Sequence, residues 1–262
     1  MPGVALRHSV LMTGPRARFV RDVMGLGRDV RLLWLPKPGD AAATKTIETV
    51  TGQVVTWDAT VAGRLSALGN GVAQSFVSAS TQYGSAPDTT SLTFGTGVAD
   101  TPFSVVALAN ITNTAAYRTC VGKWVSGQEE WLLAVDPTDL LALLLGDISA
   151  AISIQRGSDA AITMGSWRLF GASYDGTGGA TAANGITLYQ DGAVIASTAT
   201  NNAGYVAMEN GTSDIEFGAF FAHTQGLLDG SLALLLVVAR ALTTVEHRAL
   251  AIMCNRYFGL GL

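Results

Sequence analysis

Short runs of apolar and β-branched residues, separated by turn residues, recur along this chain from residue 41 onward. This spacing predicts an all-β protein built from many short strands. Several of the runs are almost continuously apolar, which is typical of strands covered on both faces. We therefore expect two antiparallel sheets packed as a sandwich. The predicted strands include residues 51–57, 72–77, 103–111, 131–135, 140–145 and 151–155.

Residues 186–190 and 193–197 form the clearest predicted hairpin. The dipeptide Asp191-Gly192 lies between the two runs, and it favours a two-residue turn because both positions tolerate positive φ. The hairpin is a purely local signal, since the turn residues and the flanking alternation stand next to each other in the sequence.

One short C-terminal helix is predicted near residues 244–257. Thr243 can cap its first turn, and Glu246, three residues later, can complete a capping box. Gly259 is a suitable residue to end it, because glycine adopts the left-handed conformation without strain. The expected apolar stripe of this helix consists of Val245, Ala249, Ile252, Met253 and Tyr257.

The first 40 residues differ from the rest of the chain in charge and in pattern. They contain seven basic and three acidic residues, a net charge of +4, whereas the whole chain carries −4. The segment from Pro36 to Gly39 has the composition of a linker. We therefore divide the chain into a basic N-terminal arm, residues 1–40, and a sandwich domain, residues 41–262.

The arm is interpreted as a docking segment because it combines arginines with a group of large apolar residues. A solvated, disordered tail would not need such a group. Burial against a partner subunit, with arginines paired to carboxylates, is the favoured explanation. Contacts to nucleic acid come second, because the arm lacks the interleaved aromatic residues that stack on bases. The candidate docking residues are Arg16, Arg18, Arg21, Arg28, Arg31, Leu32, Leu33, Trp34 and Leu35.

Charged residues make up only 14% of the chain, which suits either a surface packed against neighbours or an ordinary sandwich with a Thr/Ser-rich surface. Cys120 and Cys254 are far apart in sequence, and buried free thiols are favoured over a disulfide. The longest apolar run of the C-terminal half, Leu232 to Ala239, is far shorter than the ~20 residues of a membrane span. Arg7 and His8 interrupt the N-terminal segment, so no secretory signal is expected.

Six features follow one another in the C-terminal half: a strand beginning with Trp, a Tyr-Asp-Gly turn, a Leu-Tyr-x-Asp-Gly hairpin, a strand ending in Gly, an anchoring glycine, and a Leu-Thr-x-x-Glu helix start. They are Trp167, Tyr174-Asp175-Gly176, Leu188-Tyr189-Gln190-Asp191-Gly192, Phe217-Gly218, Gly230 and Leu242-Thr243-Thr244-Val245-Glu246. In this order they resemble the laminin-G-like, concanavalin A-like jelly-roll domain, over residues 70–255. The resemblance implies a jelly-roll sandwich, in a family that is mostly a binding and packing scaffold, with enzymes in some branches.

Catalytic and metal chemistry receive little support. Some jelly-roll relatives are glycosidases, which need paired carboxylates, and the only comparable cluster here is Asp214 and Glu216. It lacks the preceding and trailing glutamates of those enzymes, and Glu129 and Glu130 are adjacent, so they point to opposite faces of a strand. We therefore expect no enzyme activity, no catalytic residues, no metal site and no cofactor; a bound calcium ion stays open as an alternative, because oxygen ligands are available. Turn chemistry explains the aspartates that precede glycine, which are Asp175, Asp191 and Asp229.

Trp124 and Trp131 flank a Gly-Gln-Glu-Glu turn and are the candidate glycan-stacking residues. An exposed indole ring can stack on a sugar, but packing in the core is the favoured alternative for both. The tryptophans therefore give a weak signal for a carbohydrate ligand.

The composition also resembles that of tailed-phage structural proteins that carry a laminin-G-like domain. This second resemblance implies a non-enzymatic virion protein that decorates or cements a phage capsid through its arm. Its partners would be other virion proteins, above all the major capsid protein, and further copies of itself; neither a membrane nor nucleic acid is expected as a partner. The alternative is a carbohydrate-binding module of a phage tail or a cell-surface protein, with a glycan as ligand.

Overall fold

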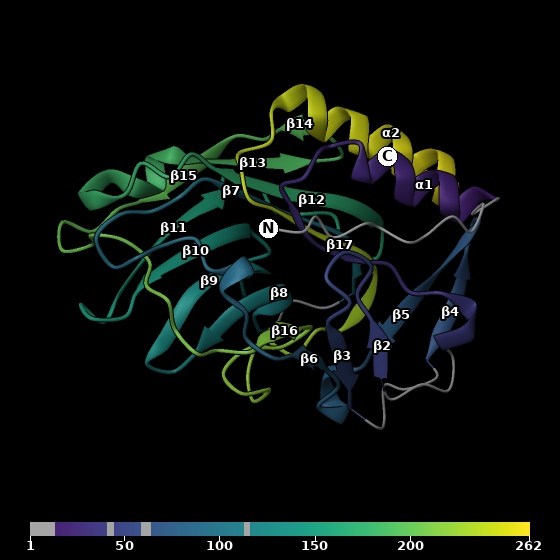
Figure 1. Ribbon diagram of the computed structural model, residues 1–262, viewed down its shortest axis with the longest axis horizontal. Coiled ribbons are helices and arrows are strands. Elements are labelled where there is room, and N and C mark those ends of the chain that lie inside the picture. Colours follow the sequence, from purple (N-terminus) through teal and green to yellow (C-terminus); the bar gives the residue numbers. More distant parts are fainter. Residues whose placement is uncertain (1–13, 41–44, 59–63, 113–115) are drawn as a thin grey trace, which may run out of the picture.

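The computed structural model describes residues 14–40, 45–58, 64–112 and 116–262. Two antiparallel sheets pack face to face (Figure 1). The eight-stranded sheet contains β1 (Val30–Trp34), β4 (Leu65–Leu68), β5 (Gly71–Phe76), β7 (Phe103–Ile111), β12 (Trp167–Tyr174), β13 (Ile186–Gln190), β14 (Ala193–Val194) and β17 (Gly230–Val238). The nine-stranded sheet contains β2 (Lys45–Ile47), β3 (Val54–Trp57), β6 (Gly84–Ala86), β8 (Arg118–Val125), β9 (Gln128–Val135), β10 (Leu141–Asp147), β11 (Ile152–Ser158), β15 (Ser197–Thr200) and β16 (Ile215–Phe217).

The strand order confirms the predicted sandwich. The eight-stranded sheet follows the order β14-β13-β12-β7-β17-β5-β4, with β1 paired to β17, and the nine-stranded sheet follows β15-β11-β10-β9-β8-β16-β6-β3-β2. Two α-helices, α1 (Pro15–Met24) and α2 (Thr244–Phe258), lie over the eight-stranded sheet (Figure 1). Short 3-10 helices η1 (Pro38–Asp40), η2 (Ser78–Ser80), η3 (Thr90–Leu92) and η4 (Gly179–Gly185) occur in the connections.

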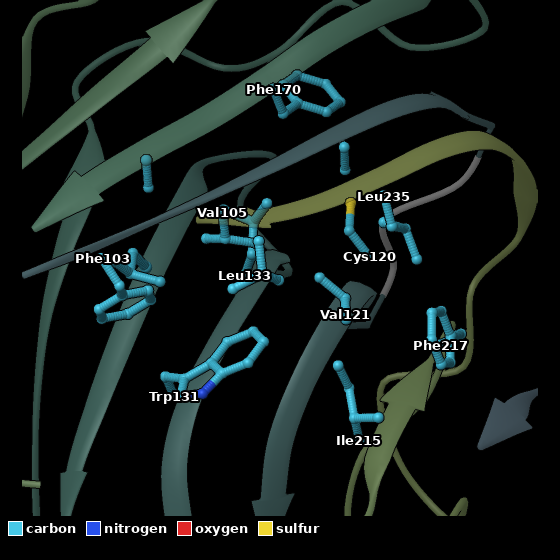
Figure 2. Packing of buried hydrophobic residues seen from close by; sticks show 14 of the residues in the cluster. Phe103, Val105, Cys120, Val121, Trp131, Leu133, Phe170, Ile215, Phe217 and Leu235 are labelled. Atoms are coloured by element: carbon cyan, nitrogen blue, oxygen red, sulfur yellow. The ribbon is translucent and has the colours of Figure 1, made fainter. Parts of the chain in front are cut away.

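The main core lies between the two sheets and is built from the inward-facing residues of both. Phe103 stacks on Phe94 with ring centroids 4.4 Å apart, and the indole of Trp131 lies 5.8 Å from Phe103. Trp131 Nε1 donates a hydrogen bond to the carbonyl of Leu92 at 2.9 Å, so the buried polar atom of the indole is satisfied. Figure 2 shows this part of the core, and the buried thiol of Cys120 belongs to the same cluster.

The structure corrects the division of the chain at residue 40. β1 is hydrogen-bonded to β17 along Leu32 to Trp34, so it is a strand of the sandwich. Alternation sends Leu32 and Trp34 into the core between the sheets, while Leu33 and Leu35 pack beneath the helices. The four apolar residues are therefore buried by their own chain, and the reason for expecting them to dock on a partner disappears. Residues 1–13 of the expected arm lie outside the described residues.

Helix α2 confirms the predicted caps, but Tyr257 is the one member of the predicted stripe that is fully buried. Thr243 Oγ1 accepts from the Glu246 backbone, the Glu246 carboxylate accepts from the Thr243 N–H at 2.8 Å, and Gly259 is left-handed. The buried face, however, is made by His247, Leu250, Ala251, Cys254, Tyr257 and Phe258. Val245 and Ile252 are exposed, at 77% and 43%. The caps depend on residues that are neighbours in the sequence, whereas the buried face of the helix depends on how the helix packs on the sheet.

The predicted hairpin is shorter than expected, because β14 contains only two residues. The chain then leaves the eight-stranded sheet, and β15 pairs with β11 in the nine-stranded sheet. The turn is confirmed, with Asp191 and Gly192 at φ of 54° and 81°. Cys120 and Cys254 are free and buried, as predicted, and burial raises the pKa of the Cys120 thiol to about 12. In the described ranges, neither α-helix is long and apolar enough for a bilayer span.

A buried histidine makes stability depend on pH. His247 stacks on Tyr189 at 3.7 Å, and its Nε2 shares a 2.9 Å hydrogen bond with Ser173 Oγ. Burial lowers its pKa to about 4 from the ordinary 6.5. Between about pH 6.5 and pH 4 this imidazole is protonated in the unfolded chain but neutral in the folded chain. The free energy of unfolding therefore decreases as the pH is lowered through this range, by a total of roughly 3 kcal/mol.

We expect this loss in urea denaturation curves recorded between about pH 7 and pH 4.5. His247→Gln removes the titrating group, so the difference in stability between the wild type and this variant should shrink as the pH falls. Val245→Ala, at an exposed and non-titrating residue of the same helix, is the control and should retain the wild-type slope. A constant difference between wild type and His247→Gln at every pH would contradict the prediction.

Candidate ligand-binding face

The two outer faces of the sandwich differ in how they are covered. Helices α1 and α2 close the outer face of the eight-stranded sheet (Figure 1). The outer face of the nine-stranded sheet instead carries a small apolar cluster that contains Trp124 of β8 and Leu132 and Ala134 of β9. The connection from β16 to β17, residues 218–229, folds back over this cluster. This face can therefore present side chains to a ligand.

The connection contains a strained turn. Three consecutive residues, Phe221, Ala222 and His223, have φ of 54°, 52° and 68°. Left-handed backbone at non-glycine residues costs on the order of 1–3 kcal/mol each, so surrounding contacts must fix it. Phe220 and Gln225 exchange hydrogen bonds of 2.9 and 3.1 Å across the turn, and the Phe221 N–H donates to the Trp124 carbonyl at 2.8 Å. The turn is thereby pinned to β8.

A buried carboxylate holds the other end of this turn. Glu216 on β16 accepts a hydrogen bond from the His223 N–H at 3.2 Å, and its Oε2 lies 3.3 Å from the imidazole Nδ1. The imidazole stacks on Tyr83 with centroids 3.7 Å apart. Burial, together with the charges of Asp58 and Glu216, raises the pKa of Tyr83. Glu216 and Asp214 line one shallow hollow of about 300 Å³, but Glu216 is engaged in fixing the turn.

A larger hollow of about 470 Å³ lies between this turn, the β8–β9 hairpin and the end of β10. Trp124, only 6% exposed, contributes to its floor, and the half-buried Phe221 contributes an aromatic wall. The carboxylate of Glu129 has no hydrogen-bond partner among the described residues, although its backbone pairs with Trp124 in the β8–β9 ladder. Asp147 is already satisfied, because it accepts from Ala150 N at 3.0 Å and from Val206 N at 2.9 Å. The lining residues are Trp124, Ser126, Gly127, Glu129, Asp147, Ile148, Ala151, Ile152, Ser153 and Phe221.

This arrangement suits a small polar ligand with an apolar face. Aromatic rings stack on C–H surfaces, while the free carboxylate of Glu129 and the hydroxyls of Ser126 and Ser153 provide hydrogen-bonding groups. Ligand pockets combine such walls with a few placed polar groups. Within the described parts of the chain, no three His, Cys, Asp or Glu side chains gather as a metal site would require.

The predicted site residues are placed very differently from one another. Trp131 is fully buried in the main core, so the glycan-stacking hypothesis is wrong for this residue. Trp124 does reach a hollow, but mostly as its floor. The sequence analysis did not select Phe221 or His223. The adjacent aromatic residues Phe220 and Phe221, in a loop bounded by Gly218 and Gly226, were a signal that could have indicated this turn. The left-handed conformation of this turn has no counterpart in the sequence, because it depends on Trp124 and Glu216.

The arginines proposed for docking also differ in their contacts and exposure. The Arg16 guanidinium donates to the carbonyls of Pro36 and Leu35 at 2.8 and 2.7 Å, so it ties α1 to the segment after β1. The others are less engaged within the chain: Arg18, Arg21 and Arg28 are exposed, and Arg31 is half-buried. The structure thus does not bring the nine predicted docking residues together into one cluster.

Comparison with known proteins bears on the fold. No protein-family model and no curated protein sequence matches this chain. Among solved structures, the chain is similar to the binding domain of Paraclostridial Mosquitocidal Protein 1, with a TM-score of 0.62 and 13% identity, covering 85% of this chain and 52% of that one. The botulinum neurotoxin serotype G binding domain gives a TM-score of 0.59 and 14% identity, covering 89% of this chain and 54% of that one.

A third similar structure is the botulinum neurotoxin serotype D ligand binding domain in complex with N-acetylneuraminic acid. Its TM-score is 0.56 at 12% identity, with 86% of this chain and 50% of that one covered. The chain thus spans about half the length of these three structures. Together with the sheet order, the similarity establishes the fold. The chain is an all-β jelly-roll sandwich.

Proposed function

We propose that this chain is a non-enzymatic binding domain that recognises a carbohydrate at the hollow between Trp124 and Phe221. One observation carries the proposal: an aromatic wall, a carboxylate without a partner and two hydroxyls converge on the face that the helices leave open. The similar toxin domains, which are described as binding domains, support a ligand-binding role. The structure solved with N-acetylneuraminic acid supports a sugar as the ligand class.

The geometry of the carboxylates supports a non-enzymatic role. The carboxylate pair that the sequence singles out, Asp214 and Glu216, is unsuited to glycoside hydrolysis, because Glu216 accepts a hydrogen bond from the strained turn and lies against His223. Hydrolysis needs one carboxyl group free to donate a proton to the leaving oxygen and a second that faces the sugar. The expected place of the chain in a phage virion, with the major capsid protein and further copies of itself as partners, stays a prediction.

Carbohydrate binding is tested with an array of neutral and sialylated glycans, followed by calorimetric titration of the best sugar. Phe221→Ala is expected to weaken binding about tenfold or more, because it removes the stacking surface. Glu129→Gln should weaken it less, since an amide oxygen still accepts hydrogen bonds. Phe221→Tyr keeps the ring and should retain binding, which separates loss of stacking from loss of the turn.

The matched control is Tyr117→Ala, which removes an aromatic ring from a neighbouring hollow of about 600 Å³ on the same face. Unchanged affinity in this variant would assign the sugar to the hollow at Trp124 and Phe221. A complete loss in Tyr117→Ala with normal binding in Phe221→Ala would place the site elsewhere. Absence of any bound glycan on the array would contradict the proposed function itself.

A further inference from the structure

A second exposed surface lies on the opposite side of the molecule, where α1 and α2 pack side by side (Figure 1). Phe19 in the middle of α1 stacks on Tyr257 near the end of α2, with centroids 4.7 Å apart. At the other ends, Arg240 bonds both the Leu26 carbonyl at 2.9 Å and the Glu246 carboxylate at 2.6 Å. The helices are therefore antiparallel, and their outward sides form one continuous surface.

This surface, which we call the paired-helix face, presents apolar and cationic side chains together. Val245 and Ile252 of α2 are 77% and 43% exposed, and Met24 of α1 is 36% exposed. On α2, the sequence positions of the exposed residues differ by three or four, so they form one stripe along the helix. The face consists of Met24, Val245 and Ile252 with Arg18, Arg21, Arg248 and Arg256.

The arginines of the paired-helix face have few ionic partners within residues 14–40, 45–58, 64–112 and 116–262. Arg18, Arg248 and Arg256 make no ion pair with any residue that the structure describes, and Arg21 approaches Asp22 only at 3.9 Å. Arg240, by contrast, is held by Glu246 at 2.6 Å. The face is thus locally cationic on a chain whose net charge is −4. Unpaired guanidinium groups are ready to bind carboxylates in bidentate geometry.

The face is also hollowed where the two helices meet. A cavity of about 350 Å³ is lined by Phe19, Met253 and Tyr257, and its wall also contains two arginines and one carboxylate, Arg18, Arg256 and Asp22. Its aromatic and thioether surfaces can receive one apolar side chain. The two arginines can pair with carboxylates on either side of that side chain. Arginine, methionine and aromatic residues are the types that are enriched in protein interfaces.

We propose that the paired-helix face is a docking surface for an acidic segment of a partner protein, with an apolar side chain in the hollow. Charge complementarity selects the acidic partner, because the unpaired arginines would be repelled by a basic one. A nucleic acid would satisfy the arginines but leave Val245 and Ile252 without a contact. A membrane is disfavoured, because the main apolar side of α2 is already buried on the sheet. This surface is independent of the proposed carbohydrate site.

The test uses the full chain and a short fluorescent peptide in which one leucine is flanked by glutamates. We expect binding by anisotropy that weakens about tenfold when the glutamates are replaced by glutamines, and similarly in Arg256→Glu, as expected for loss and reversal of a charge contact. Replacing the leucine by serine, or Ile252 by serine, should also weaken binding. Lys45→Glu on β2 makes the same charge change away from this face and is the control; it should bind normally.

Several results would overturn the docking proposal. They are the absence of peptide binding, equal binding of the glutamate and glutamine peptides, or unchanged binding in Arg256→Glu. Preference for a DNA duplex or for phosphatidylserine vesicles over the peptide would identify a different class of partner. Self-association of the free chain that disappears in Arg256→Glu, without peptide binding, would make the occupant a second copy. Circular dichroism of each variant confirms that the sandwich is intact.

Discussion

Replacing Trp34 by alanine is expected to lower the free energy of unfolding by about 3–5 kcal/mol. Trp34 is buried in the core between the sheets, where its ring lies 5.3 Å from Trp57 and 6.0 Å from Phe217. Alanine would leave a cavity that the two sheets cannot close, because β1 is held in place by β17. Guanidinium denaturation followed by circular dichroism measures the loss.

Two controls separate the cavity from other effects. Trp34→Phe keeps most of the ring and removes an indole N–H that has no hydrogen-bond partner in the described part of the chain, so its cost should be about 1.5 kcal/mol or less. Val98→Ala, at a residue 81% exposed, should change stability by no more than about 0.5 kcal/mol. A loss below about 1 kcal/mol in Trp34→Ala would mean that β1 is dispensable and would restore the docking-arm interpretation.

Lys123→Met is expected to be about equally severe, with a loss of roughly 3–5 kcal/mol. The ammonium group of Lys123 is fully buried and lies 2.6 Å from both Asp88 Oδ1 and Glu130 Oε1. It also donates to Thr93 Oγ1 at 3.1 Å. Methionine fills a similar volume but leaves the buried Glu130 carboxylate without its counter-charge, and an unpaired buried charge is strongly destabilising.

The pH dependence and a second substitution identify the cause. Burial raises the pKa of Glu130, even though Lys123 opposes the shift. Without the lysine this pKa rises further, so Lys123→Met should regain stability as the pH falls and Glu130 becomes protonated in the folded state. Lys123→Met with Glu130→Gln should recover much of the loss. If the two substitutions are additive, the ion pair is not the source of the effect.

The local signals in the sequence predicted much of the sandwich. The strand at residues 103–111 has the predicted ends, because it is a continuous apolar run bounded by polar and turn residues. The capping box of Thr243 and Glu246 and the turn at Asp191-Gly192 form as expected, since each involves residues only a few positions apart. The prediction was wrong for β1, which was assigned to a docking arm. Its partner strand β17 lies near the opposite end of the chain. The apolar group of β1 called for burial but did not specify the partner.

For the candidate sites, too, some features follow from the sequence and others depend on the tertiary structure. The sequence by itself determined the all-β class, the helix caps, and that Leu32 to Leu35 had to be buried, because these follow from periodicity, neighbouring residues and apolar surface. Tertiary structure alone decided that Trp131 lies in the core while Trp124 reaches a hollow, since both have the same side chain and the packing of the sheets distinguishes them. It also decided that Val245 stays outside while His247 is buried, and that the turn at Phe221 is left-handed. In each case the deciding contacts come from residues distant in sequence, so the outcome depends on how the whole chain packs.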